Sequence, residues 1–145
     1  MYSMKDNSFL PTGPLSLGIE LVYYSPDIEK TLAWFDDILG WLTQVDRRDD
    51  NNQAVHGIAY TVPLQYFSNK FSSNIKIHIF SGEPAKGVIS FIPTTKLEKL
   101  VAFANRKKDC GCHCAVNQSE DGTLYTHLKT IDGSVLTFYQ ENDLG

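Results

Sequence analysis

The chain has 145 residues, of which 42% are hydrophobic and 21% are charged, values that are ordinary for one soluble globular domain. Its formal net charge of -4 argues against nucleic acid or an anionic membrane surface as the main partner. No apolar run approaches the roughly 18 residues of a membrane-spanning helix, and no signal-peptide pattern precedes the domain, so we expect a cytoplasmic protein.

Residues 1–15 contain two prolines and one glycine with little hydrophobic periodicity, and we interpret them as an N-terminal arm. The first strand is expected at 17–25, where successive side chains face opposite sides of a sheet. One set comprises Ile19, Leu21 and Tyr23, and the other comprises Glu20, Val22 and Tyr24.

A helix is predicted to follow this strand directly. Ser25 suits the N-cap position and Pro26 the first helical position, while Gly40 is expected to end the helix. The apolar residues of one helical face recur at spacings of four, three and four residues, and they are Ile28, Leu32, Phe35 and Leu39.

Three further strands complete this first unit. They are expected at 41–48, 55–62 and 75–80, and in the last of these apolar and polar residues alternate. A loop with three aromatic residues is expected at 63–73, and 81–86, with a glycine and a proline, is interpreted as a linker.

The same plan then repeats. A strand beginning at Gly87 leads into a second helix, for which Thr95 and Glu98 form a predicted capping box. Strands are expected at 112–118, 123–130 and 134–141, separated by Asp-Gly turns at 121–122 and 132–133. The apolar stripe of the helix comprises Leu97, Leu100, Val101 and Ala104.

The predicted fold class is α+β, with two βαβββ modules at 16–81 and 87–141 within one domain, 16–145. The modules are expected to form a curved mixed sheet with both helices on its outer face. Ile19, Leu21, Ile89 and Phe91 should then face the helices. The opposite, concave side should carry Glu20, Val22, Ser90 and Ile92.

All three cysteines lie between positions 110 and 114, so they cannot form a disulfide framework and fit a reducing compartment. Their alternation is typical of a strand that places three thiols on one face, where cysteine behaves as a small apolar residue. A soft-metal cluster is the alternative, and the roles of Cys110, Cys112 and Cys114 stay open.

Two phrases carry a family resemblance. The first runs from Tyr24 to Phe35 and on into Ile38-Leu39-Gly40-Trp41, and the second runs from Asp132 to Tyr139. Together with the duplicated βαβββ unit, they resemble the vicinal-oxygen-chelate superfamily, which includes glyoxalase I, bleomycin-resistance proteins, extradiol dioxygenases and fosfomycin-resistance enzymes. The similarity spans about residues 17–141 and implies no single reaction, because the family hosts several chemistries and some pure binders.

The resemblance also implies where a metal would bind. In family members that use one, four strand positions supply the ligands, and here these positions hold Glu20, His78, Val88 and Thr137. A divalent ion such as Zn, Ni, Fe or Mn usually takes three or more protein ligands. Because Val88 cannot contribute and Thr137 is a weak ligand, the resemblance implies a degenerate site in which only Glu20 and His78 could hold a metal.

Glu20 and His78 are also the candidate catalytic residues, since a carboxylate and an imidazole can act as general base and acid. A pairing of Glu20 with Lys76, and a structural role for His78, are the alternatives. His56 and His127 are each expected to be hydrogen-bonded strand residues, although either could point into the same hollow. The predicted ligand-binding residues are Tyr24, Tyr60, Lys76, Phe80, Ser90, His127, Thr137 and Tyr139.

Three functional hypotheses follow. The first is a small-molecule-binding protein of the bleomycin-resistance kind, with a degenerate metal site. The second is a metal-dependent glyoxalase-like lyase or isomerase, or a dioxygenase relative. The third is an effector-sensing or regulatory domain that acts through a protein partner, for which the 63–73 loop is the candidate contact. The family resemblance further implies a homodimer, and the identity of the ligand or substrate stays open.

Overall fold

The computed structural model describes residues 19–61, 75–94, 96–106 and 114–140. The first module comprises β1 (Ile19–Ser25), α1 (Ile28–Trp34), the π-helix η2 (Phe35–Leu39), β2 (Leu42–Arg48), β3 (Ala54–Tyr60) and β4 (Ile75–Ser81). The second comprises β5 (Gly87–Pro93), α2 (Leu97–Ala104), β6 (Asn117–Gln118), β7 (Leu124–Lys129) and β8 (Ser134–Gln140). Neither α1, η2 nor α2 is long and apolar enough to cross a membrane.

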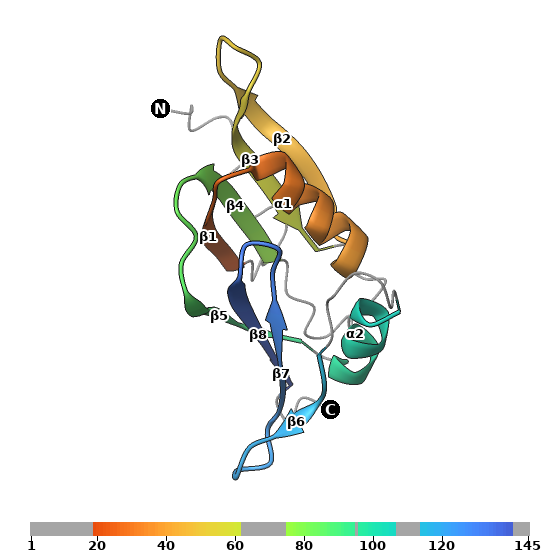
Figure 1. Cartoon of the computed structure of the whole chain (residues 1–145). Helices are drawn as coiled ribbons and strands as arrows, with labels where there is room; N and C mark the ends of the chain where they lie inside the picture. Colours follow the sequence, from red (N-terminus) through yellow and green to blue (C-terminus); the bar gives the residue numbers. More distant parts are fainter. Residues whose placement is uncertain (1–18, 62–74, 95, 107–113, 141–145) are drawn as a thin grey trace, which may run out of the picture.

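The strands form two four-stranded sheets with the same topology (Figure 1). Sheet 1 has the order β1-β4-β3-β2 and sheet 2 the order β5-β8-β7-β6. In each sheet the first and last strands of the module pair in parallel, while the other pairs are antiparallel. The predicted α+β fold with two βαβββ modules is therefore confirmed, with one mixed sheet in each module.

The first helix begins two residues later than predicted. Its N-cap is Asp27, whose carboxylate accepts a hydrogen bond from the Lys30 backbone amide at 3.1 Å. The Ser25 hydroxyl instead accepts from the Asp27 amide and bonds the Thr31 hydroxyl. The end of the helix agrees with the prediction, because Gly40 adopts the left-handed conformation with φ of 69° that favours glycine.

The second helix does not begin with the predicted capping box. Its N-cap is Lys96, which makes no side-chain capping bond, and Thr95 lies outside the described residues. The first helical amide, that of Leu97, donates to the side-chain carbonyl of Gln140 at 2.9 Å. The predicted stripe is confirmed at its three buried positions, which are Leu97, Val101 and Ala104.

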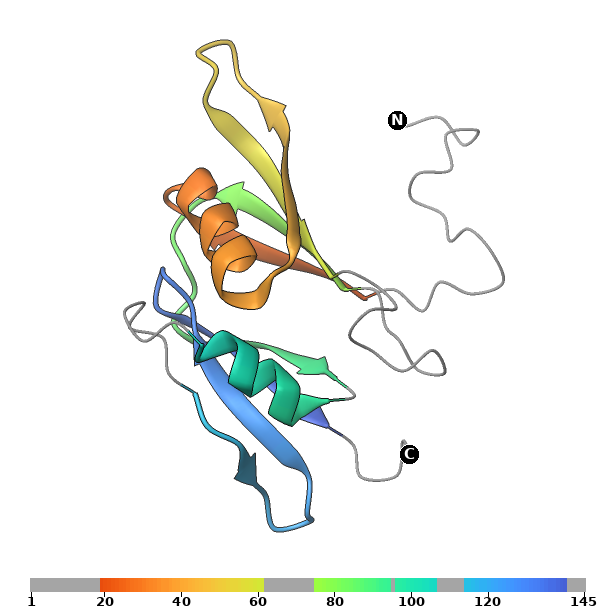
Figure 2. The same cartoon turned by 90° about the vertical axis from the view of Figure 1, so that its right-hand side faces the viewer.

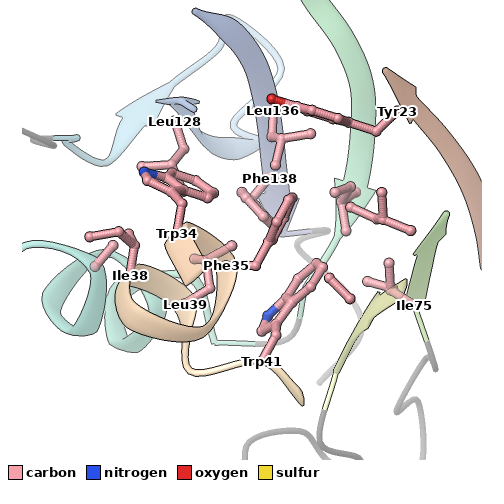
Figure 3. Packing of buried hydrophobic residues seen from close by; sticks show 14 of the residues in the cluster. Tyr23, Trp34, Phe35, Ile38, Leu39, Trp41, Ile75, Leu128, Leu136 and Phe138 are labelled. Carbon is pink, nitrogen blue, oxygen red and sulfur yellow. The ribbon is translucent and has the colours of Figure 1, made fainter. Parts of the chain in front are cut away.

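One hydrophobic core serves both modules. The helices lie next to each other across the two sheets (Figure 2), and side chains from both modules converge in the cluster of Figure 3. Trp41 meets Phe138 of β8 edge-on, with ring centroids 6.4 Å apart, and also stacks on Phe35 at 5.3 Å. Since neither sheet buries its helix side alone, the modules are expected to fold as one unit.

A buried polar cluster also joins the modules. The hydroxyl of Tyr23, on β1, bonds the Thr130 hydroxyl at 2.7 Å and donates to the Asp132 carboxylate at 2.8 Å, both near the β7–β8 turn. Thr31 donates to the same carboxylate. Burial raises the pKa of the Tyr23 hydroxyl well above its ordinary value, since the side chain is only 2% exposed.

The predicted facing is correct for sheet 1 and wrong for part of sheet 2. On β5, Ile92 is 1% exposed in the core, whereas Phe91 is 66% exposed. The cause is a β-bulge between Val88 and Ser90, which shifts the register so that Ser90 lies opposite the buried Leu136. An extra residue in a strand reverses the facing of everything after it.

Candidate functional site

The side of each sheet that the helices do not cover, here called the helix-free face, differs sharply from the apolar side. On sheet 1 the isoleucines of β4 at 75, 77 and 79 are buried under α1. The alternate side chains of β4 therefore lie on the helix-free face. The strand register places the following residues on this face: Glu20, Val22, Tyr24, His56, Ile58, Tyr60, Lys76, His78 and Phe80.

Three of these side chains, together with Asp46 of β2, form a hydrogen-bonded chain across all four strands. Glu20 Oε1 lies 2.6 Å from His78 Nε2, on the neighbouring strand β4. His78 Nδ1 lies 3.0 Å from His56 Nε2, on β3. His56 Nδ1 then lies 2.9 Å from Asp46 Oδ2, on β2. We refer to Glu20, His78, His56 and Asp46 as the four-residue chain.

The four-residue chain is sheltered in the middle and open at both ends. The His56 and His78 side chains are 15% and 17% exposed, whereas the carboxylates of Asp46 and Glu20 are 43% and 49% exposed. Charge-assisted hydrogen bonds of this kind are shorter and stronger than neutral ones. The arrangement therefore fixes two imidazoles while leaving carboxylate oxygen available to a ligand.

Aromatic rings lie beside the four-residue chain. The imidazole of His56 stacks flat on Phe80, with centroids 4.6 Å apart and planes 5° apart. Tyr24 is exposed and lies 6.4 Å from Phe80, tilted by 41°. We refer to Tyr24, Phe80 and His56 as the aromatic platform. Such a surface suits the flat group of a small organic molecule.

The remaining predicted residues of sheet 1 lie at the other end of the same face. Tyr60 and Lys76 are register partners, both half-buried. Lys76 is also the register partner of Glu20, yet within the described ranges Glu20 pairs with His78 and makes no ion pair with Lys76. The alternative pairing of Glu20 with Lys76 is therefore not formed.

The predicted residues of sheet 2 form a second, smaller group. His127 Nδ1 lies 2.6 Å from the hydroxyl of Thr137, which is buried. Tyr125 contacts His127 edge-on at 5.3 Å and is the register partner of Tyr139. Ser90 lies outside this group, because it faces the helix side with Leu136. In the part of the chain that the structure describes, no hydrogen bond joins this group to the four-residue chain.

Comparisons with known proteins agree on one fold. Residues 20–82 match the family model described as bleomycin resistance protein domain. A glyoxalase-related enzyme from Clostridium phytofermentans superposes with a TM-score of 0.73 and 25% identity, covering 91% of this chain and 100% of that one. The chain has the fold of the glyoxalase, bleomycin resistance protein and dioxygenase superfamily. The resemblance to the vicinal-oxygen-chelate superfamily is thereby confirmed.

Two bleomycin-related structures share the fold at lower identity. One is a bleomycin resistance determinant encoded on the transposon Tn5, with a TM-score of 0.60, 15% identity and coverage of 87% of this chain and 98% of that one. The other is a bleomycin-binding protein from bleomycin-producing Streptomyces verticillus, in complex with copper(II)-bleomycin. Its TM-score is 0.57 and its identity 17%, and the match covers 91% of this chain and 100% of that one. No curated protein matches the chain.

The metal-ligand positions of this superfamily do not fit a metal here. Val88 offers no donor, and the Thr137 hydroxyl is bonded to His127. Both ring nitrogens of His78 are engaged, one by Glu20 and one by His56. Among the described residues, no three His, Cys, Asp or Glu side chains converge as a metal would require.

The cysteine motif falls mostly outside the described residues, which exclude Cys110 and Cys112. Cys114 is half-buried, and its backbone amide donates to the Asn105 side chain at 2.9 Å. Burial raises the pKa of the Cys114 thiol, which disfavours the reactive thiolate. Cys114 therefore resembles a packed apolar side chain more than a reactive thiol.

Two residues of the four-residue chain were not among the predicted site residues. His56 was expected to be an ordinary hydrogen-bonded strand residue, although its parity with Tyr60 already placed both on one face. Asp46 was not singled out at all. It reaches His56 at an irregularity of β2 between Val45 and Arg47, and a local register shift of this kind leaves no clear mark in the residue pattern.

Proposed function

We propose that the protein binds a small organic molecule on the helix-free face of sheet 1, in the manner of bleomycin resistance proteins and without a resident metal ion. The observation that carries this proposal is the four-residue chain, in which the imidazole nitrogens bond protein groups instead of converging on one point. The adjacent aromatic platform supplies apolar contact area. Structures of similar fold include proteins in complex with bleomycin.

The site is expected to combine stacking with a few polar contacts. Tyr24 and Phe80 offer ring faces, and Glu20 offers a carboxylate oxygen beside them. Tyr60 and Lys76 border the same face and would contact the far end of a long ligand. His127, Thr137 and Tyr139 lie on sheet 2, and we propose that they join the site from a second subunit.

We further propose a homodimer. The edge strand of each sheet exposes apolar side chains, namely Val22 and Tyr24 on β1 and Val88 and Phe91 on β5. Exposed apolar residues grouped on an edge strand favour association. Sedimentation velocity should give twice the monomer mass, and a monomer at high micromolar concentration would contradict the dimer.

Binding can be tested directly with bleomycin, both metal-free and loaded with copper(II), by titration calorimetry. Replacing Phe80 by Ala should weaken binding about tenfold, because a stacked aromatic pair contributes roughly 0.5–1.5 kcal/mol. Phe103→Ala is the matched control, since it removes a ring of α2 that packs against the Arg106 guanidinium, away from the helix-free face of sheet 1. Equal affinities for wild type and Phe80→Ala would contradict this site.

The absence of a resident metal has its own measurement. Metal analysis of protein purified without chelators should find less than one divalent ion per five chains, with the same result for Glu20→Gln. A stoichiometric ion that Glu20→Gln removes would overturn the metal-free proposal. It would support the second hypothesis, a metal-dependent glyoxalase-like lyase or isomerase, or a dioxygenase relative.

A reaction without a metal stays the alternative that one observation favours, because the short Glu20–His78 contact is an acid–base pair. Turnover by wild type that Glu20→Gln abolishes, with ligand affinity unchanged, would establish it. The regulatory hypothesis depends on residues 63–73, which lie outside the described residues.

A further inference from the structure

We propose that Gly82 is a positioning residue of the ligand site and that it sets the place of the Tyr24 ring. Because Gly82 has no side chain, it leaves the space in which this ring lies, and the ring stays available to the flat aromatic group of a ligand. This inference rests on the proposed binding function. It adds one residue to the site and names the class of group that the aromatic platform receives.

Gly82 directly follows β4, at the start of the segment that leads to β5 (Figure 1). Its backbone amide donates to the carbonyl of Ser25 at 3.0 Å, which continues the pairing of β1 and β4 beyond the register pair of Ser25 and Ser81. Because side chains alternate along an extended chain, position 82 faces the same side as Phe80. A side chain at this position would therefore stand on the helix-free face.

The space that such a side chain would need is occupied by Tyr24. A Cβ atom at position 82 would lie 3.0 Å from Cδ1 of the Tyr24 ring and 3.4 Å from its Cγ and Cβ atoms, and these are the three nearest heavy atoms. The optimal separation of two carbon atoms is about 3.5–4.0 Å. The backbone itself would accept alanine, since Gly82 is not among the glycines with positive φ. The obstacle to a side chain is thus the Tyr24 ring.

This placement determines how the Tyr24 ring is presented on the aromatic platform. The ring is tilted by 41° against Phe80, with centroids 6.4 Å apart, and does not stack flat on it. One face of Phe80 is covered by His56, whose ring plane is inclined by only 5° at 4.6 Å. Tyr24 is 49% exposed, so it offers ring surface that its protein neighbours do not cover. A methyl group at position 82 would move the ring from this place.

The group that such a ring recognises best is flat and aromatic. Aromatic pairs in offset or edge-to-face contact attract each other by more than the area they bury. A puckered, saturated ring of the same size brings fewer of its atoms to contact distance and therefore has less dispersion attraction. The site is accordingly expected to prefer a planar ring to its saturated counterpart, as long as Tyr24 keeps its place.

The first arm of the test measures the ring without a ligand. In Gly82→Ala, proton NMR should show changed chemical shifts for the rings of Tyr24 and Phe80. Glu83→Ala is the matched control, because Glu83 is the next residue of the same segment and is exposed, and it should leave both rings as in wild type. Unchanged ring shifts in Gly82→Ala would overturn the proposal.

Thermal unfolding adds a readout of the contact itself. Replacing glycine by alanine restricts the unfolded chain and stabilises a protein where the folded backbone accepts it. Gly82→Ala should therefore raise the unfolding midpoint more in a Tyr24→Ala background than in wild type, because the obstructing ring is then absent. Equal midpoint changes in the two backgrounds would show that Gly82 and Tyr24 are not coupled, and would overturn the proposal.

The second arm measures ligand preference by NMR titration with two neutral probes, 2-naphthylmethanol and its saturated counterpart, decahydro-2-naphthylmethanol. Wild type and Glu83→Ala should bind the planar probe at least about threefold more tightly than the saturated one. Gly82→Ala should weaken binding of the planar probe about two- to tenfold and bring the two affinities close together. Tyr24→Ala should have the same effect, and adding Gly82→Ala to it should cause no further loss.

The outcomes separate this inference from the proposed function. A preference for the planar probe that persists in Gly82→Ala, or a further loss in the double variant, would overturn the positioning role and leave the binding function intact. Equal binding of both probes by wild type would overturn the preference for a flat ring. If neither probe nor bleomycin binds wild type, the proposed function falls and this inference falls with it.

Discussion

The helix-free faces of the two sheets share one topology and carry different chemistry. At the register position of Glu20 in sheet 1, sheet 2 has Val88, and at that of His78 it has Thr137. The helix sides, by contrast, are alike: Ile77 and Ile79 on β4 are matched by Leu136 and Phe138 on β8, all buried. The duplication thus preserves the side that builds the core, while the chain of two carboxylates and two imidazoles lies on only one of the two free faces.

The largest expected effect tests whether the two sheets depend on one core. Phe138→Ala should lower the free energy of unfolding by about 3–5 kcal/mol, through lost transfer energy and a cavity. Because Trp41 of the first module packs on this ring, both modules should unfold together in urea, at a lower midpoint. Ile131→Ala, at an exposed turn position, should change stability by less than about 0.5 kcal/mol. Separate unfolding of sheet 1 would refute a common core.

A second change tests how closely each helix approaches its sheet. A Cβ atom at Gly57 of β3 would lie 2.9 Å from Ile28 and 3.0 Å from Leu32 on α1, whereas the corresponding position of β7 holds Thr126. Gly57→Ala should therefore cost about 1–3 kcal/mol through overpacking. Thermal unfolding measures this loss, and an unchanged midpoint would mean that α1 can shift at no cost.

The same contrast explains what could be predicted from sequence. Sheet 1 was assigned correctly because β1 and β4 alternate without interruption, so Glu20 and His78 fall on one face by parity alone. Sheet 2 was assigned wrongly beyond Val88, since a bulge in β5 reverses the facing of Phe91 and Ile92. Bulges depend on pairing with neighbouring strands, and a single strand's pattern does not encode that pairing.

Only two members of the four-residue chain were predicted as site residues, for a related reason. Glu20 and His78 stand out as a carboxylate and an imidazole in apolar strands. Asp46 sits in a polar stretch of β2, where nothing distinguishes it from Asp49 or Asp50. Only the folded register brings it to His56. Residues that act through a hydrogen-bonded partner are thus the ones that sequence patterns miss.

A third prediction concerns the polar cluster that joins the two modules. Tyr23→Phe removes hydrogen bonds to Thr130 and Asp132 and should cost about 1–2 kcal/mol near neutral pH. Because the pKa of Tyr23 is raised in the folded state, its stabilisation is complete below the ordinary tyrosine pKa of about 10 and is lost as the pH rises above it. The difference between wild type and Tyr23→Phe should accordingly shrink above pH 10 in urea unfolding. A difference that stays constant to pH 11 would contradict the linkage.

The smallest expected change in monomer stability tests why the edge strand of sheet 2 exposes an aromatic side chain. Phe91 corresponds to Val22 of sheet 1, and both are exposed on edge strands. Phe91→Ser should alter the unfolding free energy of the monomer by less than about 0.5 kcal/mol. It should nevertheless raise the dimer dissociation constant tenfold or more, since central aromatic residues contribute most to association.

Sedimentation of Phe91→Ser beside Ile131→Ser, a similarly exposed apolar position on a turn, separates the effect of a specific interface from the effect of surface hydrophobicity in general. If both variants dimerise as wild type does, Phe91 is not part of the dimer interface, and that interface must be formed by another surface.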